Sequence, residues 1–302
     1  MSSELLGAAQ NVLKGNLGGA WDINKGYADA YTDLGIARRF GGASAAYSLR
    51  DIGALDGPVV RVRRSSDNAE DNFSANQIIS GALEAFVGAS NDGFVEIWYD
   101  QSGNFRHAIQ ETATNQPKIV SSGSLITVNG KPAITFDGSD DFLEVDGSSS
   151  DVSNEVAYSF SPSGDFGLFI VSKQSTGNIA DSRDAGGDGI FLQQASSNTT
   201  RFRYNASANN IDVTATRDAQ HFNTMTLDGN TLSASVDGGT AVTKTVVAGV
   251  DTTNNLVLGK AFSGNNSNFM DGELQEAIFY ENSKASEKSE IETDINNFYS
   301  IT

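Results

Sequence analysis

The stretch that decides the fold is Trp98-Tyr99-Asp100-Gln101-Ser102-Gly103-Asn104, which follows the apolar run Phe94-Val95-Glu96-Ile97. Apolar and polar residues alternate towards the tryptophan, and this period of two predicts a strand. Asp, Ser, Gly and Asn then come in close succession, and they favour turns because their side chains bond nearby backbone groups or tolerate positive φ. We therefore expect Trp98 to pack in the core, and Asp100, Ser102 and Asn104 to fix the end of the strand.

Many other short apolar runs, separated by Gly, Asn and Asp, make up the rest of the chain. The 302 residues include 31 Gly and 4 Pro, a composition typical of strands joined by tight turns. Asn129-Gly130 is the strongest hairpin signal among them. Because strands do not alternate with helices, a parallel sheet is not expected, and the sequence predicts an all-β antiparallel sandwich or barrel.

Helical patterns mark the two ends of the chain. Residues 3–14 and 25–40 carry apolar side chains at helical spacing, and Gly41-Gly42 marks the start of the β pattern. We expect residues 1–42 to form an N-terminal docking arm and residues 43–302 to form the β domain, which ends in a helix from Ser286 to about Tyr299. The arm either docks on another protein or folds back onto its own chain, and the sequence leaves both open.

Charge and cysteine content exclude several classes of function. The formal charge is −18, and because four acidic and four basic residues cancel within residues 1–40, all of it lies in residues 41–302. Such a surface repels phosphate backbones, so no nucleic-acid partner is expected; the charge serves either solubility or cation binding. The absence of Cys excludes disulfides and thiolate chemistry. No signal peptide or transmembrane helix is expected, so we predict synthesis in the cytoplasm without membrane insertion.

Five stretches of the β region together resemble the catalytic domain of the arabinofuranosidase family: residues 45–50, 60–68, 98–104, 115–120 and 128–132. That family has a concanavalin A-like fold, so the resemblance implies an antiparallel jelly-roll sandwich over residues 44–300. Residues 136–143 and 272–280 are similar to strands of the related laminin-G-like domains. The same motifs recur in structural proteins of tailed bacteriophages, on tails, fibres and capsid surfaces.

The resemblance also implies that the family's catalytic machinery is lost. The family's acid/base Asp lies in a Gly-Asp-Asn-Ser-Asn segment, and Asn265 stands in its place in Gly264-Asn265-Asn266-Ser267-Asn268. An amide cannot donate and recover a proton as a carboxylic acid does. Residues 201–216, which correspond to the region of the nucleophile, contain no Glu. We therefore expect a protein that is not an enzyme, with Gly264, Asn265 and Asn266 as candidate carbohydrate contacts.

A group of acidic residues offers oxygen ligands of the kind that Ca²⁺ prefers. Its members are Asp137, Asp140, Asp141 and Glu273. Related lectin-like domains bind calcium with such residues, although Gln275 stands where they often carry an Asp. The alternative is that these carboxylates cap turns and face solvent, so calcium is the one cofactor that the sequence indicates and leaves open.

These observations lead to the expectation of a bacteriophage virion structural protein, either a capsid decoration or a tail or fibre component, present in many copies. Its arm would dock on other virion proteins through seven apolar and aromatic side chains: Leu5, Leu6, Val12, Leu13, Trp21, Tyr27 and Tyr31. Two alternatives stay open. The first is an adhesin that binds glycans on the host surface, and the second is an arabinofuranosidase-type glycoside hydrolase.

Overall fold

The computed structural model describes residues 35–53, 57–147, 155–160, 164–205, 207–247, 249 and 254–301. Trp98, the first residue of the stretch Trp98–Asn104, is the last residue of strand β4 (Gly93–Trp98). Trp98 is fully buried, and its ring centroid lies 5.7 Å from that of Tyr47. The Asp100 carboxylate accepts hydrogen bonds from the backbone N–H groups of Ala46, Ser102 and Arg106 at 2.9, 2.9 and 3.1 Å. The sequence predictions that Trp98 packs in the core and that Asp100 fixes the turn are confirmed.

The strands close into a barrel, so the predicted jelly-roll sandwich is wrong. Antiparallel pairing runs through eight strands and returns to its start. In order of pairing they are β4, β6 (Lys118–Ser121), β10 (Ile134–Asp137), β20 (Asp271–Tyr280), β12 (Phe166–Asp181), β19 (Val257–Leu258), β11 (Leu143–Glu144) and β5 (Ala108–Ile109). Closure between β5 and β11 rests on one residue pair, Ile109 with Glu144. Such a short contact between distant segments leaves no periodic pattern in the sequence.

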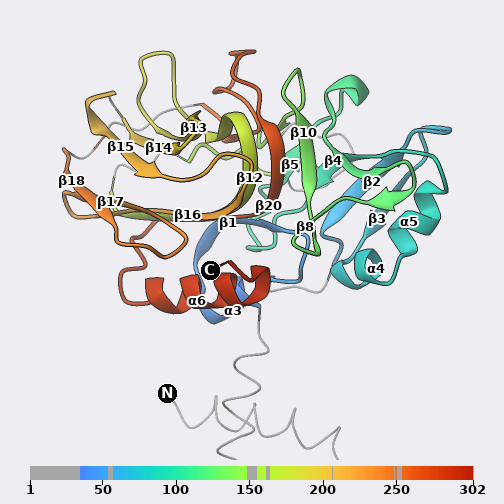
Figure 1. Ribbon diagram of the computed structural model, residues 1–302, viewed down its shortest axis with the longest axis horizontal. Helices are drawn as coiled ribbons and strands as arrows, with labels where there is room; N and C mark the ends of the chain where they lie inside the picture. The colour runs from blue at the N-terminus through green and yellow to red at the C-terminus, as the bar shows by residue number, and fades with distance from the viewer. Residues whose placement is uncertain are drawn as a thin grey trace, which may run out of the picture. The chain divides into compact units, whose positions relative to one another are not determined.

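Further strands extend the barrel into one hydrogen-bonded network of 18 strands. The first half of β12 pairs with β16, and its second half pairs with β13. The remaining strands are β1 (Ala43–Ser48), β2 (Val60–Arg64), β3 (Glu70–Phe73), β7 (Ser124–Leu125), β13 (Ile190–Ser196), β14 (Thr199–Tyr204), β15 (Asn210–Thr214), β16 (Gln220–Asp228), β17 (Thr231–Val236) and β18 (Val242–Thr245). Strands β13 to β18 lie beyond β12 on the left of Figure 1, whereas β1 pairs with β20, β2 with β4, β3 with β2, and β7 with β6.

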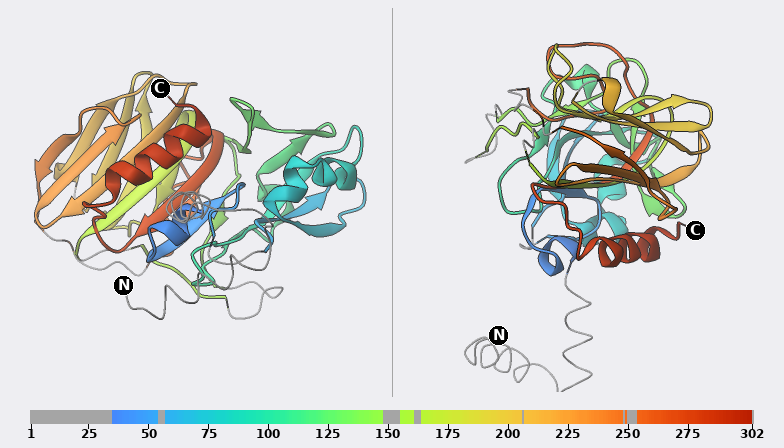
Figure 2. Two further views of the ribbon diagram at one scale, coloured as in Figure 1. Left: turned by 90° about the horizontal axis from the view of Figure 1, so that it is seen from below. Right: turned by 90° about the vertical axis from the view of Figure 1, so that its left-hand side faces the viewer.

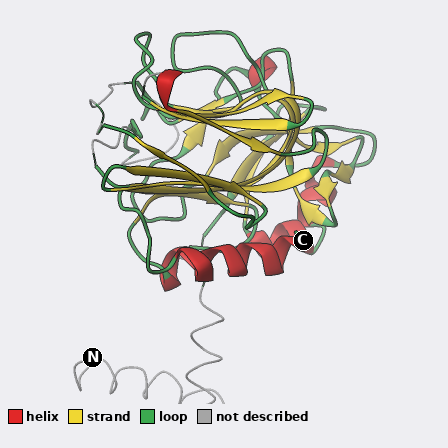
Figure 3. Ribbon diagram, turned by 60° about the vertical axis from the view of Figure 1, so that its left-hand side comes forward, coloured by secondary structure: helices red, strands yellow, loops and turns green. Residues whose placement is uncertain are grey.

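Helices are short and few among the described residues, as Figure 3 shows. They are α3 (Ile36–Arg39), α4 (Ala75–Ile79), α5 (Ala82–Val87) and α6 (Lys288–Tyr299), with two 3₁₀ turns, η1 (Ala113–Asn115) and η2 (Ser207–Asn209). The predicted C-terminal helix is confirmed, although it begins two residues later than Ser286. None of the described helices combines the length and the apolar character needed to span a membrane.

Alternation along β12 supplies two separate cores. Leu168 and Ile170 pack in the larger core, whereas Phe169 and Val171 pack in a smaller core on the other face. Helix α6 completes this smaller core with Ile291, Ile295 and Tyr299. Figure 2 shows α6 lying across the outer face of the strands, which explains why β12 is apolar on both sides.

A buried ion pair lies between β20 and α6. Glu276 of β20 is fully buried and accepts hydrogen bonds from Nε and Nη2 of Arg50 at 2.8 and 3.0 Å. The same guanidinium pairs with Asp294 of α6 at 2.9 Å and lies 4.4 Å from the ring centroid of Phe298. Burial alone would lower the pKa of Arg50, but its bonds to Glu276 raise it above the ordinary value. One arginine therefore joins the barrel to its C-terminal helix.

Asn129 and Gly130 form the predicted hairpin turn between β8 (Thr127–Val128) and β9 (Lys131–Pro132). Their φ angles are +49° and +72°, as a two-residue turn of this kind requires. The side-chain amide of Gln275, which is fully buried in β20, donates to the carbonyl groups of Lys131 and Pro132, each at 3.1 Å. This one side chain therefore attaches the hairpin to the barrel.

The N-terminal end of the described chain lies on the β domain. The backbone N–H of Ala37 in α3 donates to the carbonyl of Ile52 at 3.0 Å, and Ile36 is buried. Residues 1–34 lie outside the described residues. The predicted helix over residues 3–14 and all seven predicted docking side chains fall there, so the docking arm stays a prediction.

Candidate functional site

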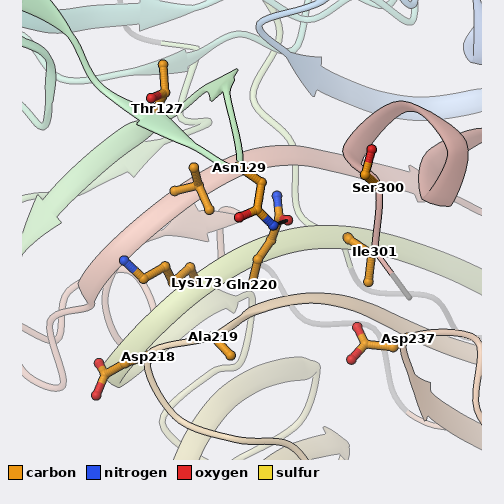
Figure 4. Close-up of a pocket in the computed structure, with 10 residues that line it drawn as sticks. Thr127, Asn129, Lys173, Asp218, Ala219, Gln220, Asp237, Ser300 and Ile301 are labelled. Atoms are coloured by element: carbon orange, nitrogen blue, oxygen red, sulfur yellow. Dashed lines mark hydrogen bonds between the residues drawn. The ribbon is translucent and has the colours of Figure 1, made fainter.

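A polar groove of about 460 Å³ opens where the β8–β9 hairpin meets β12, β16 and the C-terminus. Its lining is mainly polar, and Figure 4 shows Asn129 and Gln220 pointing towards each other near its centre. The lining residues, which define this groove, are Thr127, Val128, Asn129, Lys173, Asp218, Ala219, Gln220, Asp237, Ser300 and Ile301. The volume lies within the range typical of small-ligand sites.

The polar groove adjoins a smaller cavity of about 140 Å³, because Lys173 and Asp218 line both. Asp271 and Glu273 at the start of β20 also line this cavity, so three carboxylates face it. Nζ of Lys173 lies 3.6 Å from the carboxylate of Glu273, and Ser175 Oγ donates to Asp271 at 2.5 Å. The cavity therefore brings together several acidic groups and one cation next to the groove.

Strand register places the central groups of the groove. Lys173 of β12 lies directly opposite Gln220 of β16 in the antiparallel pair. The side chain of Gln220 accepts a hydrogen bond from Asn129 Nδ2 at 2.5 Å and donates to the side chain of Gln275. The anchored hairpin, β20 and β16 thus hold the amides of the groove in fixed positions.

An ion pair stands at the other end of the groove. Nδ1 of His221 lies 2.7 Å from a carboxylate oxygen of Asp237, and its Nε2 lies 2.8 Å from the carbonyl oxygen of Thr216. A carbonyl can only accept, so Nε2 carries a proton, and protonation of Nδ1 as well gives the carboxylate its best partner. Burial opposes the charged ring, but the hydrogen bond and the charge of Asp237 outweigh it and raise the pKa of His221.

This ion pair predicts a pH-dependent contribution to stability. Because the folded pKa of His221 is raised above its unfolded value of about 6.5, the contribution is complete below pH 6.5 and is lost as the pH rises through the folded pKa. We expect His221→Gln to cost about 1 kcal/mol of unfolding free energy at pH 5.5 and much less at pH 8.5. Urea unfolding of both proteins at the two pH values measures this, and an equal cost at both would contradict the assignment.

The predicted calcium residues are only partly brought together. The carboxylates of Asp137, Asp140 and Asp141 offer oxygens that all lie within 4.8 Å of one another, whereas Glu273 bonds Thr135 and Lys173 instead. Burial, and then the neighbouring charge of Asp137, raise the pKa of Asp141 to about 7. Its Oδ2 also accepts the backbone N–H of Asp137 at 3.0 Å, so it caps the turn as well. The donor set fits an oxygen-binding cation, and calcium there stays a prediction.

The predicted carbohydrate contacts lie in a loop that is ordered by its own side chains. Asn265 accepts a hydrogen bond from Ser267 Oγ at 2.7 Å, and Asn266 accepts one from Nζ of Lys260 at 3.0 Å. Lys260 is 3% exposed, and its Nζ lies 3.6 Å from the ring centroid of Phe142. Gly264 has a φ of +80°. The loop does not line the polar groove, so the two are separate candidate sites.

Sequence patterns missed the polar groove because its residues come from five separate segments. The one local signal was polar side chains within apolar strands, namely Lys173 after Phe169–Ser172 and Gln220 before Phe222. From the sequence, Gln275 is a departure from a calcium motif. Its bonds to the hairpin show a different use for an amide at that position.

Comparison with known proteins shows the fold. No family description matches the chain, and no curated protein matches it. Solved structures do match: a GH54 α-L-arabinofuranosidase soaked with a cyclic sulfate inhibitor has a TM-score of 0.62 at 15% identity, and an arabinofuranosidase complexed with arabinofuranosyl-α-1,2-xylobiose has 0.62 at 16%. Each match covers 86% of this chain but 64% of the other protein. The arabinofuranosidase-like fold is therefore confirmed, and the resemblance to phage and laminin-G-like proteins stays a prediction.

These matches contradict the prediction that the protein is not an enzyme. That prediction rested on Asn265 in place of one acid and on the lack of Glu in residues 201–216. The fold is shared with glycoside hydrolases over most of this chain. The structure also places three carboxylates, Asp218, Asp271 and Glu273, around one cavity elsewhere. Loss of the family's own acid is therefore not a reason to exclude catalysis.

Proposed function

We propose that this protein is a carbohydrate-binding protein that holds a neutral oligosaccharide in the polar groove. The observation that carries the proposal is the lining of the groove, which includes two amides, two carboxylates and a lysine. Amides and carboxylates pair with sugar hydroxyls, whereas an apolar cofactor would require a mainly apolar pocket. Val128, Ala219 and Ile301 add small apolar surfaces that suit the C–H faces of a sugar ring.

Removal of the Lys173 ammonium is expected to weaken this binding at least tenfold. Hydrogen bonds that involve a charged group contribute about 1.5–3 kcal/mol, and 1.4 kcal/mol corresponds to a factor of ten. Lys173→Met keeps the apolar stem and removes the charge. Calorimetric titration with a panel of neutral oligosaccharides that includes arabinofuranosyl-α-1,2-xylobiose measures the change.

Lys288→Met is the matched control, because Lys288 forms a surface ion pair with Glu292 on α6 and does not line the groove. It should bind the panel as the unchanged protein does. Equal weakening by both substitutions would locate the effect in the overall charge instead of the groove.

Glycoside hydrolysis is the second candidate, and the three carboxylates of the smaller cavity favour it. Asp271 and Glu273 are two residues apart on β20 and both line the cavity, so their Cβ atoms lie about 7 Å apart. From this spacing the two side chains can bring their carboxyl groups to the separation of about 6.5–9.5 Å that inverting glycosidases use. Hydrolysis would appear in the same titrations as released reducing sugar, and Glu273→Gln would abolish the release while the sugar still binds.

A role in a bacteriophage virion remains a separate proposal. It depends on residues 1–42, of which residues 1–34 lie outside the described part of the chain. Carbohydrate binding by the β domain is compatible with a host-glycan adhesin whether or not the arm docks on a particle.

A further inference from the structure

Two arginines and one phenylalanine form a stacked cluster on the outer face of β12, β13 and β14. The guanidinium carbons of Arg183 and Arg203 lie 4.0 and 4.5 Å from the ring centroid of Phe191, which is 3% exposed. Phe191 and Arg203 are paired across β13 and β14, and Arg183 follows the end of β12. Three different segments therefore hold the two cations around one ring.

The charges of this cluster are not fully balanced. Arg183 is held by the fully buried carboxylate of Asp181 through two bonds of 3.0 and 2.7 Å, and Arg201 is held by Asp212 through two bonds of 2.7 Å. Arg203 donates Nε to the neutral amide of Asn210 at 2.7 Å. Within the described part of the chain it forms no ion pair. Burial, and then the charges of Arg183 and Arg201, lower the pKa of Arg203, and the charge of Asp181 offsets this only in part.

The cluster lies beside the amide-rich loop that the sequence singled out. The guanidinium carbon of Arg183 is 5.8 Å from the ring centroid of Phe262, which stands just before the loop Gly264–Asn268. The backbone carbonyl of Arg183 accepts a hydrogen bond from Asn254 Nδ2 at 2.8 Å. The polar groove is elsewhere: Lys173, which lines it, and Asp181 are eight residues apart along β12, a length along the strand of at most about 26 Å at 3.3 Å per residue. The arginine cluster is therefore a second site, independent of the groove.

We propose that Arg203, supported by Arg183 and the neighbouring loop, binds the carboxylate of an acidic sugar such as a uronic acid. A guanidinium presents parallel N–H groups that match the two oxygens of a carboxylate. Asn265 and Asn266 in the adjacent loop supply amides for sugar hydroxyls. The sugar part of this inference rests on the proposed carbohydrate binding, whereas recognition of the anion rests on the arginine cluster alone.

The acidic character of the whole protein does not prevent such binding. The chain carries a net charge of −18, but at 0.1 M salt the screening length is about 10 Å. A carboxylate in contact with Arg203 is therefore governed by the nearest charges, and Arg203 is bonded to a neutral amide whereas Arg183 and Arg201 are each held by an Asp. A site that attracts an anion can exist locally on a protein that repels anions at long range.

The test is calorimetric titration of the full chain with digalacturonate, with neutral galactobiose and with acetate at 0.1 M salt. We expect digalacturonate to bind and Arg203→Gln to raise its Kd at least tenfold. Arg203→Lys should give an intermediate Kd, because lysine keeps the positive charge but lacks the two parallel N–H groups of a guanidinium. Arg201→Gln is the matched control, since it lies two residues away on the same strand and is already paired with Asp212. It should change the Kd less than twofold.

Three results would overturn the inference: no binding of digalacturonate, equal binding of galactobiose, or a Kd that Arg203→Gln leaves unchanged. Melting temperatures within a few degrees of the unchanged protein confirm that the variants fold. If acetate bound as tightly as digalacturonate, the site would be a simple anion site, and the proposed recognition of the sugar would be wrong. If digalacturonate binds through Arg203 but the neutral panel never binds, the proposed groove function fails and this inference stands.

Discussion

Arg50→Met is expected to lower the free energy of unfolding by about 3–5 kcal/mol. The substitution leaves the carboxylate of Glu276, which is fully buried, without its cation. Breaking a buried ion pair by removing one partner costs this much because the remaining charge has lost both water and its counter-ion. The contact to Asp294 of α6 is lost as well, so the helix should also loosen on the barrel. Urea unfolding followed by circular dichroism measures the loss.

The double variant Arg50→Met/Glu276→Gln separates charge burial from packing. Neutral Gln still offers a carbonyl oxygen to Ser48 Oγ, which bonds Glu276 at 2.8 Å. We expect this variant to regain at least half of the lost stability, because no uncompensated charge is left. If Arg50→Met alone lowered the free energy of unfolding by less than about 1 kcal/mol, the result would show that water reaches Glu276 in solution.

Asp100→Ala is expected to cost about 3 kcal/mol or more. Its carboxylate accepts the backbone N–H groups of Ala46, Ser102 and Arg106, and a buried donor without a partner costs about 1–3 kcal/mol. Ala46 belongs to β1, so the loss also separates the turn after β4 from the neighbouring strand. Thermal and urea unfolding of the variant measure the effect.

Asp100→Asn is the control for this substitution. Asn keeps the oxygen that accepts the hydrogen bonds from Ala46 and Ser102. In the native protein Oδ2 of Asp100 accepts the backbone N–H of Arg106, and in the variant an NH₂ group replaces Oδ2, so two donors face each other. We expect a loss of about 1–2 kcal/mol, between the native protein and Asp100→Ala. If Ala and Asn variants were equally stable, the turn would not depend on the carboxylate as the structure indicates.

Local features of the fold were predictable from the sequence. Asn129-Gly130 predicts the hairpin because both residues tolerate positive φ, and the alternation before Trp98 predicts its place in the core. Ile291 and Ile295 are four residues apart in the predicted C-terminal helix, and both lie on the face of α6 that packs on the strands. Each of these depends on residues within about ten positions of one another, which is the range over which periodicity and turn chemistry act.

Closure of the barrel and the identity of the site were not predictable in this way. The pairing of Ile109 with Glu144 that joins β5 to β11, and the ion pair of Arg50 with Glu276, connect segments 35 or more residues apart. The polar groove likewise combines the hairpin, two strands, a turn and the chain end. The sequence shows polar residues at Lys173 and Gln220, but only the register of β12 and β16 places them opposite each other.

The central claim is that the polar groove binds a neutral oligosaccharide, and residue-resolved NMR titration tests it most directly. Labelled protein is titrated with each member of the neutral panel, arabinofuranosyl-α-1,2-xylobiose included, while backbone and side-chain amide signals are followed. We predict saturable shifts that concentrate at Asn129, Lys173 and Gln220 and that Lys173→Met weakens. The absence of a saturable shift with every member of the panel, or shifts confined to residues outside the groove, would contradict the claim.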